Sequence, residues 1–225
     1  PRGDGHAVMT LPGFMAADGS TAHLRKLLGD LGYRALPWGL GRNTSDTGVT
    51  SMEEVLAYRA GVEAALAVQI EEECDRSGGR ISLVGWSLGG LIATSLAQDR
   101  PDLVRQVITL GTPFGDPRGT SVWSVMNRIY RREVRSADID AWLAYNRKAI
   151  LQVPLTALYS DSDGFVSTDV AMPPESPRTE AIRVLSSHIG FPFNPLVQYL
   201  IAERLAQGEN SWLPYDGPRL GSLID

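Results

Sequence analysis

One stretch restricts the possible folds of this chain more than any other: residues 80–87, Arg-Ile-Ser-Leu-Val-Gly-Trp-Ser, which lead into Leu-Gly-Gly-Leu-Ile-Ala. The apolar run is typical of a buried strand, and the residues after it are typical of a buried helix. At the junction, Gly85, Ser87 and Gly89 form the pattern G-x-S-x-G. A serine at such a strand-to-helix turn adopts a strained backbone that exposes its hydroxyl at the carboxyl end of a sheet.

The two glycines allow a second interpretation, in which they serve only the close packing of a strand against a helix. The pattern alone is common, and a Cβ at Gly85 or Gly89 would collide with the neighbouring strand or helix in either case. The strand–turn–helix context favours a reactive Ser87. The N-terminus of the following helix also favours negative charge that develops beside the serine.

The rest of the chain alternates between short apolar runs and amphipathic segments. We expect strands within 6–14, 34–40, 80–87, 104–114, 153–163 and 179–187, and helices within 18–33, 52–74, 88–104 and 195–207. This alternation predicts an α/β fold with a mainly parallel sheet of about six strands and helices on both faces. A chain of 225 residues suits one domain, 1–225.

Residues 116–152 interrupt this alternation between the fourth and fifth expected strands. They combine tryptophans and tyrosines with several arginines. The mixture predicts a small helical cap or lid over the mouth of the sheet. The alternative is a surface pair of helices with no role in binding.

Composition argues against several classes of partner. The net charge is −5 and the basic residues are mostly dispersed, so we expect no nucleic acid partner. No apolar run approaches the roughly 20 residues of a membrane span. No signal peptide is visible, so the cytoplasm is the default location. Three scattered histidines and the single cysteine, Cys74, offer no ligand spacing for a metal, and we expect no cofactor.

A serine nucleophile needs a base, because its hydroxyl is not acidic enough to attack unaided. The chain offers only His6, His23 and His188. In this architecture the catalytic order along the chain is serine, acid, histidine. Only His188 follows the last expected strand, so it is the predicted base, and the other two are interpreted as structural or solvent-exposed.

The acid should follow the fifth strand, where Asp161 and Asp163 are the candidates. A buried carboxylate there would hold the imidazole of His188 in the correct tautomer. Asp163 is favoured because the turn that it starts runs back into apolar residues, and Asp161 remains the alternative. Asp169 and Glu175 are remote candidates.

Two backbone N–H groups should stabilise the oxyanion of the reaction. One is expected from Leu88, directly after the serine. The other is expected from the turn after the first strand, at Phe14 or alternatively Met15, although Pro12-Gly13 could be an ordinary turn. The residues predicted to contact substrate are apolar and surround the mouth: Met15, Trp86, Trp123 and Phe165.

Five short motifs together give the chain a family resemblance. They are TLPGF at 10–14, GWSLGG at 85–90, TLGTPFGDP at 109–117, YSDSDGFV at 159–166 and SSHIGFPFNP at 186–195. From about His6 to Gln207 the chain resembles α/β-hydrolase fold proteins of the bacterial lipase and esterase type. A WGLGRN loop at 38–43 adds to the likeness. One departure is LPGF where many relatives carry a His-Gly pair.

The resemblance implies a catalytic triad of Ser87, Asp163 and His188, with oxyanion donors at Phe14 and Leu88 and a cap at 116–152. We therefore expect an enzyme that cleaves carboxylic esters through an acyl-enzyme intermediate, with a small-molecule ester or lipid as substrate. Acyl transfer, amide or thioester cleavage by the same triad, and a non-catalytic binding role, are the alternatives. The sequence leaves open contact with a lipid interface and the oligomeric state.

Overall fold

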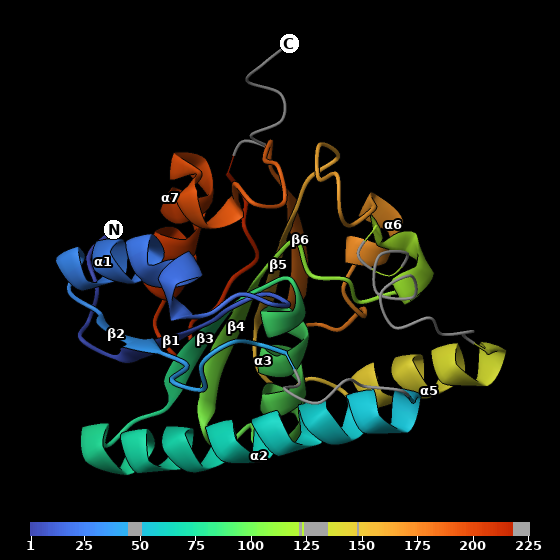
Figure 1. The fold of residues 1–225 in the computed structure, drawn as a ribbon. Coiled ribbons are helices and arrows are strands. Elements are labelled where there is room, and N and C mark those ends of the chain that lie inside the picture. The colour runs from blue at the N-terminus through green and yellow to red at the C-terminus, as the bar shows by residue number, and fades with distance from the viewer. Residues whose placement is uncertain (45–50, 122, 124–134, 148, 218–225) are drawn as a thin grey trace.

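The structure, a computed structural model, describes residues 1–44, 51–121, 123, 135–147 and 149–217 (Figure 1). Its strands are β1 (Ala7–Leu11), β2 (Arg34–Pro37), β3 (Ile81–Trp86), β4 (Val104–Leu110), β5 (Leu155–Tyr159) and β6 (Thr179–Arg183). They form one six-stranded sheet in the order β2-β1-β3-β4-β5-β6. Every neighbouring pair is parallel, which confirms the predicted α/β class.

Helices cover both faces of this sheet. They are α1 (Ala22–Asp30), α2 (Met52–Ser77), α3 (Leu88–Asp99), α5 (Ser136–Asn146), α6 (Thr168–Ala171) and α7 (Pro195–Leu205), with short 3-10 turns η1 (Asp18–Thr21), η2 (Pro117–Gly119) and η3 (Phe191–Phe193). Figure 1 shows α1 and α7 on one face and α2 and α3 on the other. None of the helices in the described part of the chain has the length and apolar character to cross a membrane.

Alternate side chains of the central strands build the core on the two faces. In β3, Leu83 joins the cluster under α2 and α3, whereas Val84 joins the cluster under α1 and α7. Both side chains are buried, because the sheet is covered on each side. Burial of each such side chain stabilises the fold by about 1.5–3 kcal/mol.

The boundaries differ from the sequence expectation where local capping decides them. Ser51 and Glu54 form a reciprocal capping box at the start of α2. Its end lies at Ser77 rather than near Cys74, because Gly78 adopts a left-handed conformation that terminates the helix. The single-turn helix α6 was not expected from the sequence.

The inserted segment is anchored to the core through α5, which lies alongside α2 in Figure 1. The guanidinium of the buried Arg59 on α2 donates to Asn146 Oδ1 at 2.6 Å and stands over the ring of Trp142. Glu63 on α2 accepts from the hydroxyl of Tyr145 at 2.7 Å. Residues 122, 124–134 and 148 of the expected cap 116–152 lie outside the described residues. A lid role for this segment therefore stays a prediction.

Candidate active site

The parallel sheet gathers the predicted serine, acid and histidine at one edge. Ser87 directly follows β3, Asp163 lies in the loop after β5, and His188 lies in the loop after β6. In a parallel sheet the carboxyl ends of all strands lie on the same edge, which is where open α/β sheets bind their ligands. The distances and hydrogen bonds at this edge show which of these groups contact one another.

Ser87 has the strained backbone that its motif predicts. Its φ is 55°, in the left-handed region, and it stands between the last residue of β3 and the first of α3. Its N–H donates to the carbonyl of Leu110 at 2.8 Å, and its carbonyl accepts from Gly90 N at 2.9 Å and from the hydroxyl of Thr112 at 3.1 Å. These bonds hold a conformation that costs on the order of 1–3 kcal/mol.

The glycines around Ser87 are required by close backbone packing. A Cβ on Gly85 would lie 2.5 Å from the nitrogen of Gly90, and a Cβ on Gly89 would overlap the carbonyl oxygens at the end of β1. A Cβ on Gly90 would overlap the hydroxyl of Thr112, a constraint that the G-x-S-x-G pattern does not include. The close backbone packing and the strained conformation of Ser87 are thus two results of one turn, and Ser87 itself is only 8% exposed. In the sequence, the doublet Gly89-Gly90 was the signal for the third glycine.

His188 and Asp163 form a buried pair. Nδ1 of His188 lies 2.8 Å from Oδ2 of Asp163, and both side chains are almost fully buried. The other oxygen, Oδ1, accepts the backbone N–H groups of Phe165 at 2.8 Å and Val166 at 3.0 Å. Because Nδ1 donates to a fixed carboxylate, Nε2 of the neutral imidazole is left as the proton acceptor.

Asp161, the other candidate acid, points elsewhere. Its side chain is about half exposed, pairs with Arg183, and accepts from the hydroxyl of Thr168 at 3.1 Å. Of the two aspartates, only Asp163 contacts His188. The sequence alone left both open because each follows β5 by only a few residues.

Aromatic contacts bring His188 beside the serine. Nε1 of Trp86, the residue before Ser87, donates to the carbonyl of His188 at 3.0 Å. The rings of Phe165 and His188 stack with centroids 5.0 Å apart. Among the described residues no hydrogen bond joins the Ser87 hydroxyl to His188, and such bonds often tighten only when substrate binds.

Gly111, which directly follows β4, is a further position at this edge that tolerates no side chain. Its φ is 54°, and a Cβ there would lie 2.8 Å from Asp163 Oδ2 and 3.1 Å from His188 Nδ1. From the sequence, this glycine within the motif TLGTPFGDP had no expected role. Because Gly111 has no side chain, the carboxylate of Asp163 has room to contact the ring of His188.

The turn at residues 12–16 lies against the serine, and it is called the oxyanion loop below because it carries the N–H group predicted to bind the oxyanion. A Cβ on Gly13 would be 3.2 Å from Cβ of Ser87. Met15, with φ 59°, donates its N–H to the carbonyl of Asn43 at 2.9 Å, so that this N–H is occupied. The N–H groups of Phe14 and Leu88 have no hydrogen-bond partner within the described ranges. The geometry therefore favours Phe14 over Met15 as the donor from this loop.

The four residues expected to contact substrate occupy different environments. Met15 and Phe165 are 52% and 40% exposed on the two loops that flank Ser87 and His188. Trp86 is only 8% exposed and packs in the core under α1 and α7. Trp123 is half-buried against the core under α2 and α3. Substrate contact by any of the four stays a prediction.

A second Ser–His–Asp arrangement lies at the opposite edge of the sheet. His6 Nδ1 bonds to Asp4, and His6 Nε2 lies 2.8 Å from the hydroxyl of Ser82. Arg105 also donates to Asp4, at 2.8 Å. Burial lowers the pKa of His6 despite its bond to Asp4. Ser82 is fully buried near the start of β3, where no substrate can reach it, so this arrangement ties the N-terminal segment to the sheet.

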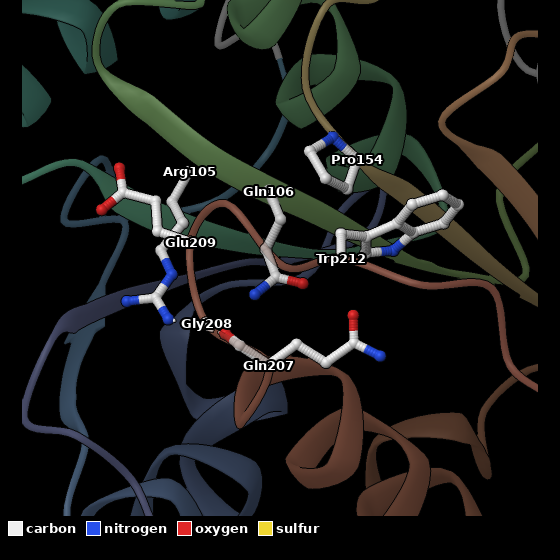
Figure 2. A pocket seen from close by; sticks show the side chains of 7 residues that line it. All are labelled: Arg105, Gln106, Pro154, Gln207, Gly208, Glu209 and Trp212. Atoms are coloured by element: carbon white, nitrogen blue, oxygen red, sulfur yellow. Dashed lines mark hydrogen bonds between the residues drawn. The ribbon is translucent and has the colours of Figure 1, made fainter.

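Two cavities lie apart from the serine itself. One, at the amino ends of β4 and β5, has a volume of about 10 Å³, room for one water, and is lined by Arg105, Gln106, Pro154, Gln207, Gly208, Glu209 and Trp212 (Figure 2). The amino ends of these strands form the edge of the parallel sheet opposite to the carboxyl end of β3, which Ser87 directly follows. The other has about 330 Å³ and is lined by Phe114, Arg147, Met172, Pro173, Pro174 and Glu175. It adjoins the loop after β4, on the serine's edge.

Comparison with known proteins identifies a matching family. The model of the alpha/beta hydrolase family matches residues 4–218. No curated protein matches the sequence.

Solved structures also resemble the chain, at low sequence identity. A lipase from Bacillus licheniformis has a TM-score of 0.66 at 15% identity, with 88% of this chain and 91% of that chain covered. Lipase B from Aspergillus fumigatus has a TM-score of 0.65 at 17% identity, with 98% of this chain and 55% of that chain covered. A monoacylglycerol lipase from Paleococcus ferrophilus has a TM-score of 0.60 at 17% identity, covering 88% and 93%. These likenesses concern the fold alone.

Proposed function

The chain belongs to the alpha/beta hydrolase family, and we propose that it cleaves carboxylic esters with Ser87 as nucleophile, His188 as base and Asp163 as the acid that orients it. The observation that carries this proposal is the buried bond between His188 and Asp163 at the edge where Ser87 is held in a strained turn. Both observations support the assignment, because the acid's role is to orient the base and a strained strand-to-helix turn is typical of a serine nucleophile.

In the first half of the reaction, the hydroxyl oxygen of Ser87 adds to the ester carbonyl while Nε2 of His188 takes the hydroxyl proton. The carbonyl oxygen becomes an oxyanion, and the N–H groups of Phe14 and Leu88 are the donors proposed to stabilise it. The tetrahedral intermediate then expels the alcohol, which receives the proton from His188. Ser87 is left acylated.

In the second half, water replaces the alcohol. His188 takes a proton from the water as its oxygen adds to the acyl carbon, and the same two N–H groups hold the second oxyanion. Collapse of this intermediate releases the carboxylic acid and returns the proton to Ser87. Throughout, the negative charge of Asp163 stabilises the imidazolium that forms twice in each cycle.

An apolar acyl group is the substrate feature best supported by the mouth of the site. Exposed apolar side chains lie on the loops that carry the proposed groups: Met15, Phe165, Ile189 and Phe193. Contiguous apolar surface around polar groups is typical of sites that take apolar ligands. The structural neighbours that are named lipases further support an ester or lipid as the substrate class.

The test compares Ser87→Ala with Ser82→Ala, because each serine belongs to a Ser–His–Asp arrangement and only Ser87 is proposed to react. Hydrolysis is measured with p-nitrophenyl acetate, butyrate, octanoate and palmitate. We expect Ser87→Ala to lower kcat/KM by at least about a thousandfold, and Ser82→Ala to keep most of the activity.

A fluorophosphonate probe should label the wild type and Ser82→Ala, but not Ser87→Ala. Retained activity in a folded Ser87→Ala variant would overturn the proposal, as would a wild type that is inert toward both esters and probe. A rate that rises with chain length would identify a lipase, whereas a sharp fall beyond short chains would identify an esterase.

A further inference from the structure

We propose that Asn43 is a positioning residue that holds the oxyanion loop in its active conformation; this inference rests on the ester hydrolysis proposed above. Asn43 lies in the loop after β2, is fully buried, and bonds to residues of the 12–16 turn. A buried asparagine amide is costly unless its polar atoms are bonded, so its partners indicate what it does.

Asn43 bonds to both ends of the oxyanion loop. Its side-chain Nδ2 donates to the carbonyl of Pro12 at 2.8 Å. Its backbone N–H donates to the carbonyl of Ala16 at 2.8 Å, and its own carbonyl accepts from Met15 N at 2.9 Å. One residue therefore bonds to the first, fourth and fifth residues of a five-residue turn.

The hydrogen bonds of the oxyanion loop occupy some of its backbone N–H groups, and an occupied N–H group cannot bind the oxyanion. Within the loop, Ala16 N bonds back to the carbonyl of Gly13 at 3.1 Å, and Met15 N is used by Asn43. Phe14 lies between these tied groups and keeps its N–H without a partner in the described structure. Of Phe14, Met15 and Ala16, only Phe14 therefore keeps a backbone N–H without an acceptor among the described residues.

The backbone of the oxyanion loop is itself strained, so the loop needs stabilising contacts from other segments. Met15 has a φ of 59°, which is unfavourable for a residue with a long side chain. On its other side, the Pro12 carbonyl lies against the Gly89 backbone and Gly13 lies against Ser87. The loop is thus held between the first turn of α3 and Asn43, and the amide of Asn43 bonds to the same carbonyl that packs on Gly89.

An aspartate at this position would remove the required donor at almost no change in size. Its carboxylate oxygen would face the Pro12 carbonyl, so that two acceptors would repel each other. A serine would be too short to reach the carbonyl and would leave it buried without this donor. Both changes remove the side-chain bond to Pro12, whereas the two backbone bonds of residue 43 and the pair of His188 and Asp163 stay in place.

The experiment measures Asn43→Asp and Asn43→Ser against Asn146→Asp. Asn146 is a buried asparagine on α5 whose Oδ1 accepts from Arg59, a role that an aspartate retains. The readouts are kcat and KM for p-nitrophenyl butyrate and the inhibition constant of a trifluoromethyl ketone, which forms a tetrahedral adduct with a serine. Folded protein is quantified by circular dichroism and size exclusion.

For both Asn43 variants we expect kcat to fall roughly tenfold to a hundredfold with little change in KM. This loss should be smaller than the loss from deleting an oxyanion donor, because the Phe14 N–H would be misplaced and not removed. Affinity for the ketone should fall by a similar factor, and the pH profile of kcat/KM should keep its midpoint. Asn146→Asp should keep its kcat and its ketone affinity. A folded Asn43 variant with unchanged kcat, or with lower kcat but undiminished ketone affinity, would refute the positioning role.

Amide hydrogen exchange of the wild type provides a test that needs no variant. The Met15 amide should be protected in the free enzyme because it bonds to Asn43, whereas the Phe14 amide should become protected only in the ketone adduct. Fast exchange at Met15 in the free enzyme would overturn the inference. Failure of the proposed function is seen separately, as an inert wild type or an active Ser87→Ala variant.

Discussion

Oδ2 of Asp163 lies 2.8 Å from Nδ1 of His188, and Oδ1 of the same carboxylate accepts two backbone N–H groups. The carboxylate is therefore fixed on both sides, by the imidazole and by its own loop. Asp161, two residues earlier, bonds to Thr168 and Arg183 instead. This difference allows the acid to be assigned by experiment.

Asp163→Asn should lower kcat by roughly 10³- to 10⁴-fold, because an amide in place of the carboxylate favours the wrong tautomer of His188 and cannot stabilise the imidazolium. Asp161→Asn is the matched control, since it makes the same chemical change on the same loop. We expect it to keep kcat within about threefold, in line with the small effects of exposed ion pairs. The measurement is the steady-state rate with p-nitrophenyl butyrate. Equal losses in the two variants would contradict the assignment.

Gly85→Ala should prevent stable folding or lower the free energy of unfolding by more than about 3 kcal/mol, because the new Cβ would lie 2.5 Å from backbone atoms of Gly90. Gly61→Ala is the control. Gly61 is exposed within α2 and has open space around its Cα, so alanine should stabilise the protein by about 0.5–1 kcal/mol. Urea denaturation followed by circular dichroism measures both. A Gly85→Ala protein as stable as the wild type would contradict the packing that we describe.

Acidification should destabilise the protein through His6. Burial lowers the pKa of His6 below its ordinary 6.5 although Asp4 opposes this, and Arg105 lowers it further. Because the unfolded chain then binds more protons, the free energy of unfolding should fall as the pH drops below 6.5, until the lowered pKa of His6 is passed. Asp4 adds to this loss in stronger acid: burial disfavours its charge, but bonds from His6 and Arg105 outweigh burial and hold its pKa well below the usual 3.8.

Urea denaturation of the wild type, His6→Gln and His23→Gln between pH 7.5 and about pH 4.5 tests this linkage. His6→Gln should show a flatter dependence on pH below 6.5 than the wild type. His23 is exposed on α1, so His23→Gln should leave the wild-type dependence unchanged. Identical slopes in the wild type and His6→Gln would contradict the prediction.

The sequence by itself determined the fold class and the order of the proposed catalytic groups. Alternating apolar runs and amphipathic segments are typical of a parallel sheet covered by helices, so the six strands and the helices on both faces could be predicted from their spacing. Ser87 was identifiable because the G-x-S-x-G pattern lies between an expected strand and an expected helix, and both are visible in the local sequence. His188 was identifiable because only one histidine follows the last strand.

The tertiary structure decided what depends on contacts between distant segments. Asp161 and Asp163 differ only in where their loop directs each side chain, and Phe14 is distinguished from Met15 only by the bond from Met15 to Asn43. The glycines at 90 and 111 are required by Thr112, Asp163 and His188, which the sequence places far away or gives no reason to connect. Local patterns fix strands, helices and turns because those depend on near neighbours, whereas the partner of each polar group is set only when the sheet brings separate loops to one edge.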